Sequence, residues 1–400
     1  MLKKLISRVF VIVSCIAALQ ILGTVILARN LEKSDMGLFR LVLTIAEIGS
    51  ILSILGIDSS LVRFLSKPEA PFKKYNWKSF LSYFSLLILL ISTLISEIMS
   101  HIYKLSIFTT LGIFALVIML GSTLIFSALL RANHKYELSM LLGRLNFVIF
   151  FVLLMTLYFF KGLSFNAAFV SYLSATILSN LFVAYYCLKI LPCGLIPVPF
   201  SVLKNGFYYF GLGVAIVFII QSANLFIGKM LSYKDLAIFA VINSTMRVFE
   251  FTQDSLYHVL VPYLNKKAQV SIGKIFVKIG ILALLIALAY LLLSKYIIHF
   301  LFKGLYDEGI YLVPLLIATG LIRTLYTLPA SIIGGIGSDC ALRNQFYLMA
   351  LAAGINIYLT YTLIQKSGLW GVASANLATW CIILLGSLVI TNKYIKIKIC

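Results

Sequence analysis

The sequence predicts an all-α integral membrane protein with twelve transmembrane helices in two pseudo-symmetric six-helix bundles. Three observations support this prediction: the composition, the spacing of the apolar runs and an internal repeat. Of the 400 residues, 62% are apolar and 12% are charged, and the mean hydropathy is +1.04. A membrane-spanning helix needs about 20 mostly apolar residues, so such a chain has little room for a soluble domain. A soluble enzyme is therefore excluded.

Apolar runs bounded by charged residues, Pro or Gly divide the chain into candidate membrane spans. Each run is expected to be a helix, because an open sheet edge could not satisfy its backbone hydrogen bonds in lipid. The expected spans are residues 9–28, 37–57, 79–99, 106–130, 139–160, 164–188, 206–228, 236–260, 273–294, 309–333, 341–363 and 369–391.

The excess of basic residues predicts the orientation of the chain in the membrane. The chain has 33 Lys and Arg against 13 Asp and Glu. In a nucleic-acid-binding protein the basic residues gather on one folded face, whereas here they lie between the apolar runs, so nucleic acid is excluded as a partner. If the N-terminus is inside, 19 of the 33 basic residues fall on the inner side and 9 on the outer side. This bias predicts that both termini lie in the cytoplasm.

The sequence contains an internal repeat. At an offset of 200 residues, the segment Leu27–Phe39 aligns with Ile227–Phe239. Because each half would hold six spans, an even number, both halves have the same orientation and the repeat is parallel. Parallel six-span repeats are a transporter architecture. The charged positions that match in this motif are Arg29 with Lys229 and Asp35 with Asp235.

The repeat and a proline-rich segment near the midpoint predict the domain boundaries. Three prolines between positions 192 and 199 are incompatible with a continuous helix. We therefore predict an N-terminal six-helix bundle over 1–188, a cytoplasmic linker over 189–205 and a C-terminal six-helix bundle over 206–400.

Charged residues within the predicted spans are the candidate functional residues. A charge at mid-helix costs about 2.5–3.5 kcal/mol, so such residues usually face a partner or a water-filled cavity. Two interpretations stay open: the charges of Arg247, Glu250 and Asp254 neutralise one another in a packed bundle, or the charged residues line a polar cavity. The candidates for binding an anionic substrate are Arg40, Arg144, Arg247 and Arg323, and those for ion coupling are Glu47, Glu250 and Asp254.

Several short patterns carry a family resemblance. They are Leu27-Ala-Arg29, Asp35-Met-Gly-Leu-Phe39, Leu55-Gly-Ile57, Val62-Arg-Phe-Leu65, Ala128-Leu-Leu-Arg-Ala132 and Gly368-Leu-Trp-Gly-Val-Ala373. With them the chain resembles bacterial flippases of polysaccharide and O-antigen repeat units, which belong to the multidrug/oligosaccharidyl-lipid/polysaccharide exporter superfamily.

The resemblance implies a function. It implies translocation of an undecaprenyl-pyrophosphate-linked oligosaccharide across the bacterial inner membrane by alternating access, as in the biosynthesis of lipopolysaccharide. The expected partners are the lipid-linked substrate, membrane lipids, and a polysaccharide polymerase with a chain-length regulator. No cofactor is expected. Coupling to a proton or sodium gradient is allowed but not required, because the membrane potential already favours outward movement of an anion.

Three alternatives are kept beside this interpretation. A multidrug exporter of the same superfamily commonly carries organic cations, for which a cavity dominated by acids would be expected. A membrane enzyme acting on lipid-linked sugars would need a cluster of acid and base residues at the outer surface. A peptidoglycan-precursor flippase usually has two additional helices. We do not expect an enzyme, because the outer loops offer only the scattered residues His101, His299, Asp307 and Glu308.

Overall fold

The computed structural model describes residues 2–65, 75–133, 135–160, 162–190, 194, 200–266, 272–336 and 338–394. Nearly all of these residues are helical, which confirms the predicted fold class. The elements are α1 (Leu2–Asn30), α2 (Lys33–Ile54), α3 (Ile57–Leu65), α4 (Trp77–Tyr103), α5 (Ile107–Ala132), α6 (Tyr136–Leu142), α7 (Leu145–Phe159), α8 (Phe165–Ile190), α9 (Phe200–Met230), α10 (Tyr233–Thr245), α11 (Arg247–Lys266), α12 (Ile272–Phe302), the 3-10 helix η2 (Asp307–Leu312), α13 (Val313–Ile336) and α14 (Asp339–Tyr394).

The chain divides into two compact units. One unit holds Val11–Leu31 with Leu38–Val217, and the other holds Phe218–Cys400 with Met1–Phe10 and Glu32–Gly37. We call them the N-terminal and the C-terminal unit. Of the predicted linker over 189–205, residues 191–193 and 195–199 fall outside the described residues and 200–205 belong to α9, so the predicted domain boundaries stay a prediction.

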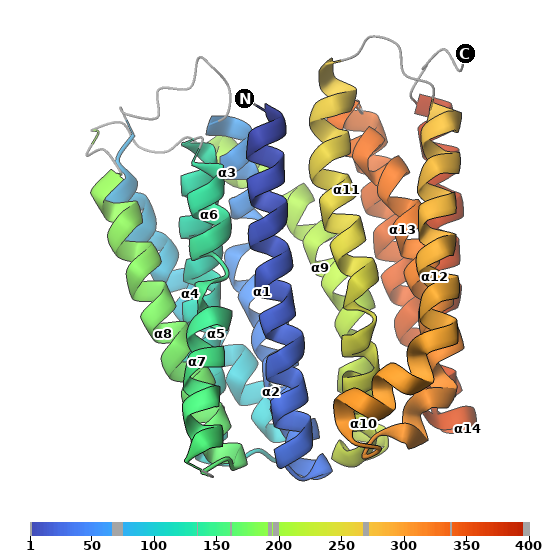
Figure 1. Cartoon of the computed structure of the whole chain (residues 1–400). Coiled ribbons are helices and arrows are strands. Elements are labelled where there is room, and N and C mark those ends of the chain that lie inside the picture. Colours follow the sequence, from blue (N-terminus) through green and yellow to red (C-terminus); the bar gives the residue numbers. More distant parts are fainter. Residues whose placement is uncertain are drawn as a thin grey trace. The chain divides into compact units, whose positions relative to one another are not determined.

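One helix lies at the centre of each unit. In the N-terminal unit α5 packs against α3, α4, α6 and α8, and in the C-terminal unit α13 packs against α11, α12 and α14 (Figure 1). The core beside α5 contains the fully buried Trp77 at the start of α4, whose ring lies 5.9 Å from that of Tyr75 and 6.0 Å from that of Phe80. Both central helices are the fourth predicted span of their half, as a repeat requires.

The helix boundaries also follow the repeat. Helix α1 ends at Asn30 and α9 ends at Met230, while α2 begins at Lys33 and α10 begins at Tyr233. The third span of each half, α4 or α12, ends in a left-handed residue, with φ of 52° at Lys104 and 53° at Lys303. Two halves that end their helices in the same way, at offsets of 199 to 200 residues, share one architecture.

Helices α4 and α12 are among the least buried of the apolar helices. Leucine and isoleucine side chains along both are exposed, among them Leu90 and Leu94 on α4 and Leu285 and Leu292 on α12. A soluble protein rarely exposes an apolar stripe of this length. The two stripes are therefore lipid-facing surfaces of a multi-pass membrane protein.

Helix α14 is a hairpin of two helices. Its 56 residues would extend about 84 Å as a straight helix, far more than the roughly 30 Å of a bilayer core. The helical conformation is interrupted at Ser367 and at Gly368, whose φ of 56° and ψ of −133° suit only glycine. Asn356 Nδ2 donates to Thr379 Oγ1 across the two arms at 3.0 Å. The chain therefore turns back at Gly368.

The structure corrects three of the predicted spans. The span over 37–57 ends at Ile54, and Leu55 and Gly56 are left-handed before α3 begins. The spans over 139–160 and 236–260 are each broken into two helices, at Gly143–Arg144 and at Met246. Hydropathy cannot locate such breaks, because it does not change where the backbone leaves the helix.

The predicted number of twelve spans stays a prediction. Within the described ranges, nine helical segments are long and apolar enough to cross a membrane, and Ser14–Asn30 is a shorter apolar helix. One of the nine, Cys340–Lys393, contains both arms of the α14 hairpin.

Candidate functional site in the C-terminal unit

An ion pair joins α11 and α13 inside the C-terminal unit. Arg323 Nη1 lies 3.3 Å from Glu250 Oε1, and the two side chains are 19% and 40% exposed. Glu250 is in the first turn of α11, where the helix dipole favours a negative charge. The sequence had placed both residues among the candidates but had not paired them. Glu250 therefore takes a partner from a different helix, α13.

A glycine allows the two helices to approach at the level of this pair. Gly320 lies one turn before Arg323 on α13, and a Cβ atom there would meet Phe249 Cγ at 2.6 Å. Phe249 precedes Glu250 and is 2% exposed. The absence of a side chain at position 320 is thus what lets α11 and α13 pack this closely.

The Arg323 guanidinium lies over an indole ring. Arg323 Cζ lies 5.1 Å from the ring centroid of Trp380, which is 4% exposed. Such a cation–π contact stabilises the charge by about 0.5–2 kcal/mol, the more so where water is excluded. Arg323 Nε is buried, and it has no hydrogen-bond partner among the described residues. The guanidinium is therefore held in place while one of its donors is unused.

A polar cluster supports the indole ring of Trp380 through Tyr326. The ring of Tyr326 lies 5.6 Å from that of Trp380, and Gln345 Nε2 donates to Tyr326 Oη at 3.2 Å. Gln345 also exchanges two hydrogen bonds of 3.1 Å with Ser387, as donor and as acceptor. Sequence reasoning missed Tyr326, Gln345, Trp380 and Ser387, because none of them carries a charge. A buried Gln within an apolar run is the signal that would have pointed to this cluster.

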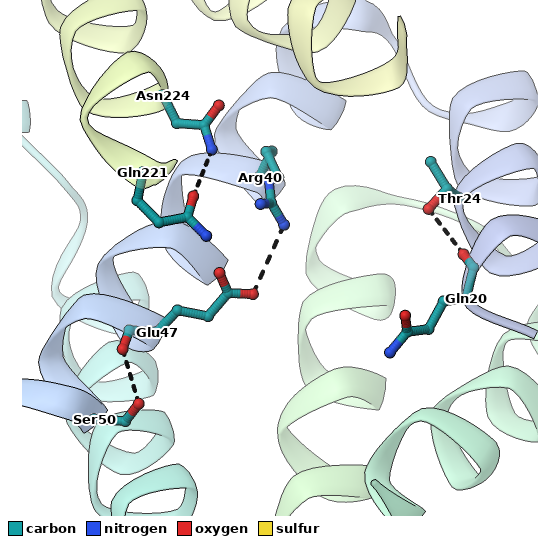
Figure 2. A network of polar contacts seen from close by, with 7 residues as sticks. All are labelled: Gln20, Thr24, Arg40, Glu47, Ser50, Gln221 and Asn224. Carbon is teal, nitrogen blue, oxygen red and sulfur yellow. Dashed lines mark hydrogen bonds and ion pairs between the residues drawn. The ribbon is translucent and has the colours of Figure 1, made fainter. Parts of the chain in front are cut away.

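A second ion pair lies within α2 of the N-terminal unit. Arg40 Nη1 is 3.8 Å from Glu47 Oε1, as Figure 2 shows, so these residues share a helix face as predicted from their spacing. The Glu47 carbonyl also accepts a hydrogen bond from Ser50 Oγ at 2.8 Å. The Arg40 charge is therefore at least partly balanced within its own helix.

Other polar residues drawn in Figure 2 belong to α1 and α9. On α1, Thr24 Oγ1 donates to the Gln20 carbonyl, and on α9, Asn224 Nδ2 donates to Gln221 Oε1 at 2.8 Å. On α9 the neighbouring Ser222 Oγ donates to Asn356 Oδ1 of α14 at 2.6 Å. These bonds satisfy polar groups within the apolar helices.

The two other candidate arginines lie at helix breaks. Arg144 is the residue that precedes α7, and Arg247 is the first residue of α11. Both are intermediate in exposure and make further interactions. Asp254 lies in α11, but its side chain falls outside the described residues.

The matched charges of the repeat sit at helix ends. Arg29 and Lys229 are in the last turns of α1 and α9, and Asp35 and Asp235 are in the first turns of α2 and α10. These signs complement the helix dipoles at both ends. Ser232 Oγ caps α10, accepting from the Asp235 backbone N–H at 3.1 Å. The repeated charges are therefore explained by helix termination and need no substrate.

Three of the residues considered for an enzyme, His299, Asp307 and Glu308, take part in ion pairs. His299 Nδ1 lies 2.7 Å from Asp307 Oδ2, and Lys33 forms an ion pair with Glu308. Within the described part of the chain, no group of three or more His, Cys, Asp or Glu is placed to hold a metal ion.

Comparison with known protein families shows which family the chain matches. The family described as "Polysaccharide biosynthesis protein" matches residues 6–268, about two thirds of the sequence. The chain belongs to this family. As in the expected superfamily, this member of the polysaccharide biosynthesis family consists of long apolar helices with few intramembrane charges. No curated protein matches its sequence.

Solved structures show the fold of this polysaccharide biosynthesis protein. The lipid II flippase MurJ in an inward closed conformation is similar, with a TM-score of 0.71 at 13% identity, over 97% of this chain and 87% of that chain. The MATE multidrug transporter DinF-BH has a TM-score of 0.70 at 13% identity, over 98% of this chain and 95% of that chain. An inward-facing MATE transporter of the MOP superfamily has a TM-score of 0.60 at 13% identity, over 94% of each chain. The predicted superfamily fold is thus confirmed.

Proposed function

We propose that this protein is a flippase that moves undecaprenyl-pyrophosphate-linked oligosaccharide, such as an O-antigen repeat unit, across the bacterial inner membrane. The family membership supports a role in polysaccharide biosynthesis, and the shared fold with a lipid II flippase and with MATE transporters supports transport rather than catalysis. Rocking of the two repeat halves would alternate access to the two sides, as in other transporters built from repeats.

The observation that supports the proposal most directly is the arrangement of residues around the Arg323 guanidinium. A guanidinium keeps its charge in a protein and presents several donors to phosphate oxygens. Arg323 is held against Trp380, and its contact with Glu250 uses only Nη1, at 3.3 Å. In this proposal Arg323 binds the pyrophosphate while the lipid tail stays in the bilayer, and Arg40, Arg144 and Arg247 add positive charge along the route.

The location of the termini, the partner proteins and the ion-coupling residues are parts of the same proposal. The termini lie in the cytoplasm, where the positive-inside bias places them. A polymerase and a chain-length regulator are the partners that would use the translocated units. Glu47, Glu250 and Asp254 are the acids proposed for coupling to a proton or sodium gradient.

The proposal is tested by transport in proteoliposomes. Purified protein is reconstituted with a fluorescent lipid-linked oligosaccharide, and the fraction that reaches the opposite leaflet is measured over time. We expect transport by the wild type and a loss of about tenfold or more for Arg323→Ala, because a buried charged hydrogen bond is worth several kcal/mol. Variant proteins are compared at equal amounts in the membrane.

The rival function is tested in the same vesicles. A multidrug exporter of the same fold would expel an organic cation such as a rhodamine dye instead of the lipid-linked sugar. Cation transport that survives Arg323→Ala, with no movement of lipid-linked sugar, would overturn the flippase assignment and favour the exporter.

A further inference from the structure

The contact between Glu250 and Arg323 is a weak one. Its single N–O distance of 3.3 Å is longer than the 2.7–2.9 Å of a charge-assisted hydrogen bond. Only Nη1 is joined, whereas arginine and carboxylate commonly form two parallel bonds. Glu250 therefore satisfies one edge of the guanidinium incompletely.

The two partners differ in how firmly they are held. The Arg323 guanidinium is fixed on Trp380, and Trp380 is supported by Tyr326. The Glu250 side chain is 40% exposed, against 19% for Arg323. The carboxylate is therefore less confined by packing than the guanidinium.

The edge of the guanidinium that Glu250 occupies determines what could replace the carboxylate. An anion that takes both Nη1 and Nη2 by two parallel bonds would bind better than the present single contact at Nη1. A phosphate group has enough oxygens to bridge two donors of one guanidinium. Glu250 carries the same kind of oxygen and the same sign of charge as such a ligand.

We propose that Glu250 is a resident competitor for the anion site of Arg323. In this inference, which rests on the proposed function, the pyrophosphate of the lipid-linked cargo displaces Glu250 from Arg323. The return of Glu250 then helps to release the cargo. Glu250 thus lowers the affinity of the site, and in doing so it keeps the cargo from being trapped.

Binding of a defined probe tests the competition. The full chain in lipid nanodiscs is titrated with farnesyl pyrophosphate, and the dissociation constant is measured by calorimetry. Glu250→Gln and Glu250→Ala both remove the competing charge, and we expect roughly threefold to tenfold tighter binding, in line with the modest strength of a partly exposed ion pair. Arg323→Gln is expected to weaken binding at least tenfold.

A matched control separates competition from the change in net charge. Glu97 on α4 is exposed in the N-terminal unit, and Glu97→Gln removes the same charge from a helix of the other unit. We expect Glu97→Gln to bind as the wild type does. Equal tightening by Glu97→Gln and Glu250→Gln would overturn the inference. Inorganic pyrophosphate should bind more weakly than farnesyl pyrophosphate, and equal affinities would overturn the assignment to a lipid-linked anion.

Transport kinetics test the release step. For Glu250→Gln we expect a lower half-saturating concentration of lipid-linked oligosaccharide together with a lower maximal rate, which a merely structural defect would not produce. If the wild type binds no probe and moves no lipid-linked sugar, the proposed function itself fails. If the wild type does both but neither Glu250 variant binds more tightly, competition is refuted and the flippase assignment stands.

Discussion

Arg323 lies over the indole ring of Trp380 in the C-terminal unit, with the guanidinium carbon 5.1 Å from the ring centroid. The two residues come from α13 and from the second arm of the α14 hairpin. The hairpin turn at Gly368 therefore supplies the surface on which the candidate anion-binding arginine rests.

Removing the indole ring should weaken anion binding. Trp380→Leu loses the cation–π contact, worth about 0.5–2 kcal/mol, which corresponds to roughly twofold to thirtyfold in affinity. Trp380→Phe should retain part of the affinity, because a smaller aromatic face remains. Titration with farnesyl pyrophosphate measures both variants. The control is Trp370→Leu on the same helix, whose ring stacks on Tyr311 instead; equal losses for both tryptophans would contradict this prediction.

A methyl group at position 320 should separate α11 from α13. Gly320→Ala places a Cβ within 2.6 Å of Phe249 Cγ, and overpacking of this kind typically costs about 1–3 kcal/mol. We expect a lower melting temperature in detergent and altered probe binding, because Glu250 follows Phe249 directly. In Gly354→Ala, where a Cβ meets nothing within 4 Å, stability should be unchanged or slightly higher. A Gly320→Ala protein as stable as Gly354→Ala would show that the helices tolerate the extra volume.

The buried amide of Gln345 should stabilise the α14 hairpin. Gln345→Leu leaves Ser387 and Tyr326 without this partner, and an unsatisfied buried polar group costs about 1–3 kcal/mol. Thermal unfolding of Gln345→Leu, Ser387→Ala and the double variant gives the coupling between the two residues. Gln365→Leu, at an exposed position of α14, is the control and should have little effect. Additive effects of the two single substitutions would argue against a direct stabilising contact.

Cysteine labelling can decide the orientation of the chain. Lys104 and Lys303 end the third span of each half and are exposed, whereas Lys135 is exposed between α5 and α6. In a variant without native cysteines, Lys104→Cys and Lys303→Cys should react with a membrane-impermeant maleimide added to intact cells. Lys135→Cys should react only after the membrane is opened. The reverse pattern would place the termini outside and refute the predicted cytoplasmic location.

The sequence by itself determined the membrane class, the helical fold and the parallel repeat. These follow from composition, from the length of the apolar runs and from matched helix ends such as Arg29 with Lys229 and Asp35 with Asp235. Each of these features depends on local sequence. A helix in lipid must form its own backbone hydrogen bonds, and the helix dipole is the same at the ends of every helix. The same reasoning placed Arg40 with Glu47, which lie on one helix face.

Only the tertiary structure decided which charges meet across helices and what surrounds them. The breaks that place Arg144 and Arg247 at helix ends leave no trace in hydropathy. Glu250 meets Arg323, and Arg323 meets Trp380, only because α11, α13 and the folded α14 pack side by side. Such contacts depend on the rotation and close approach of the helices, here set by Gly320 and Gly368, and a linear pattern of apolar residues does not specify either.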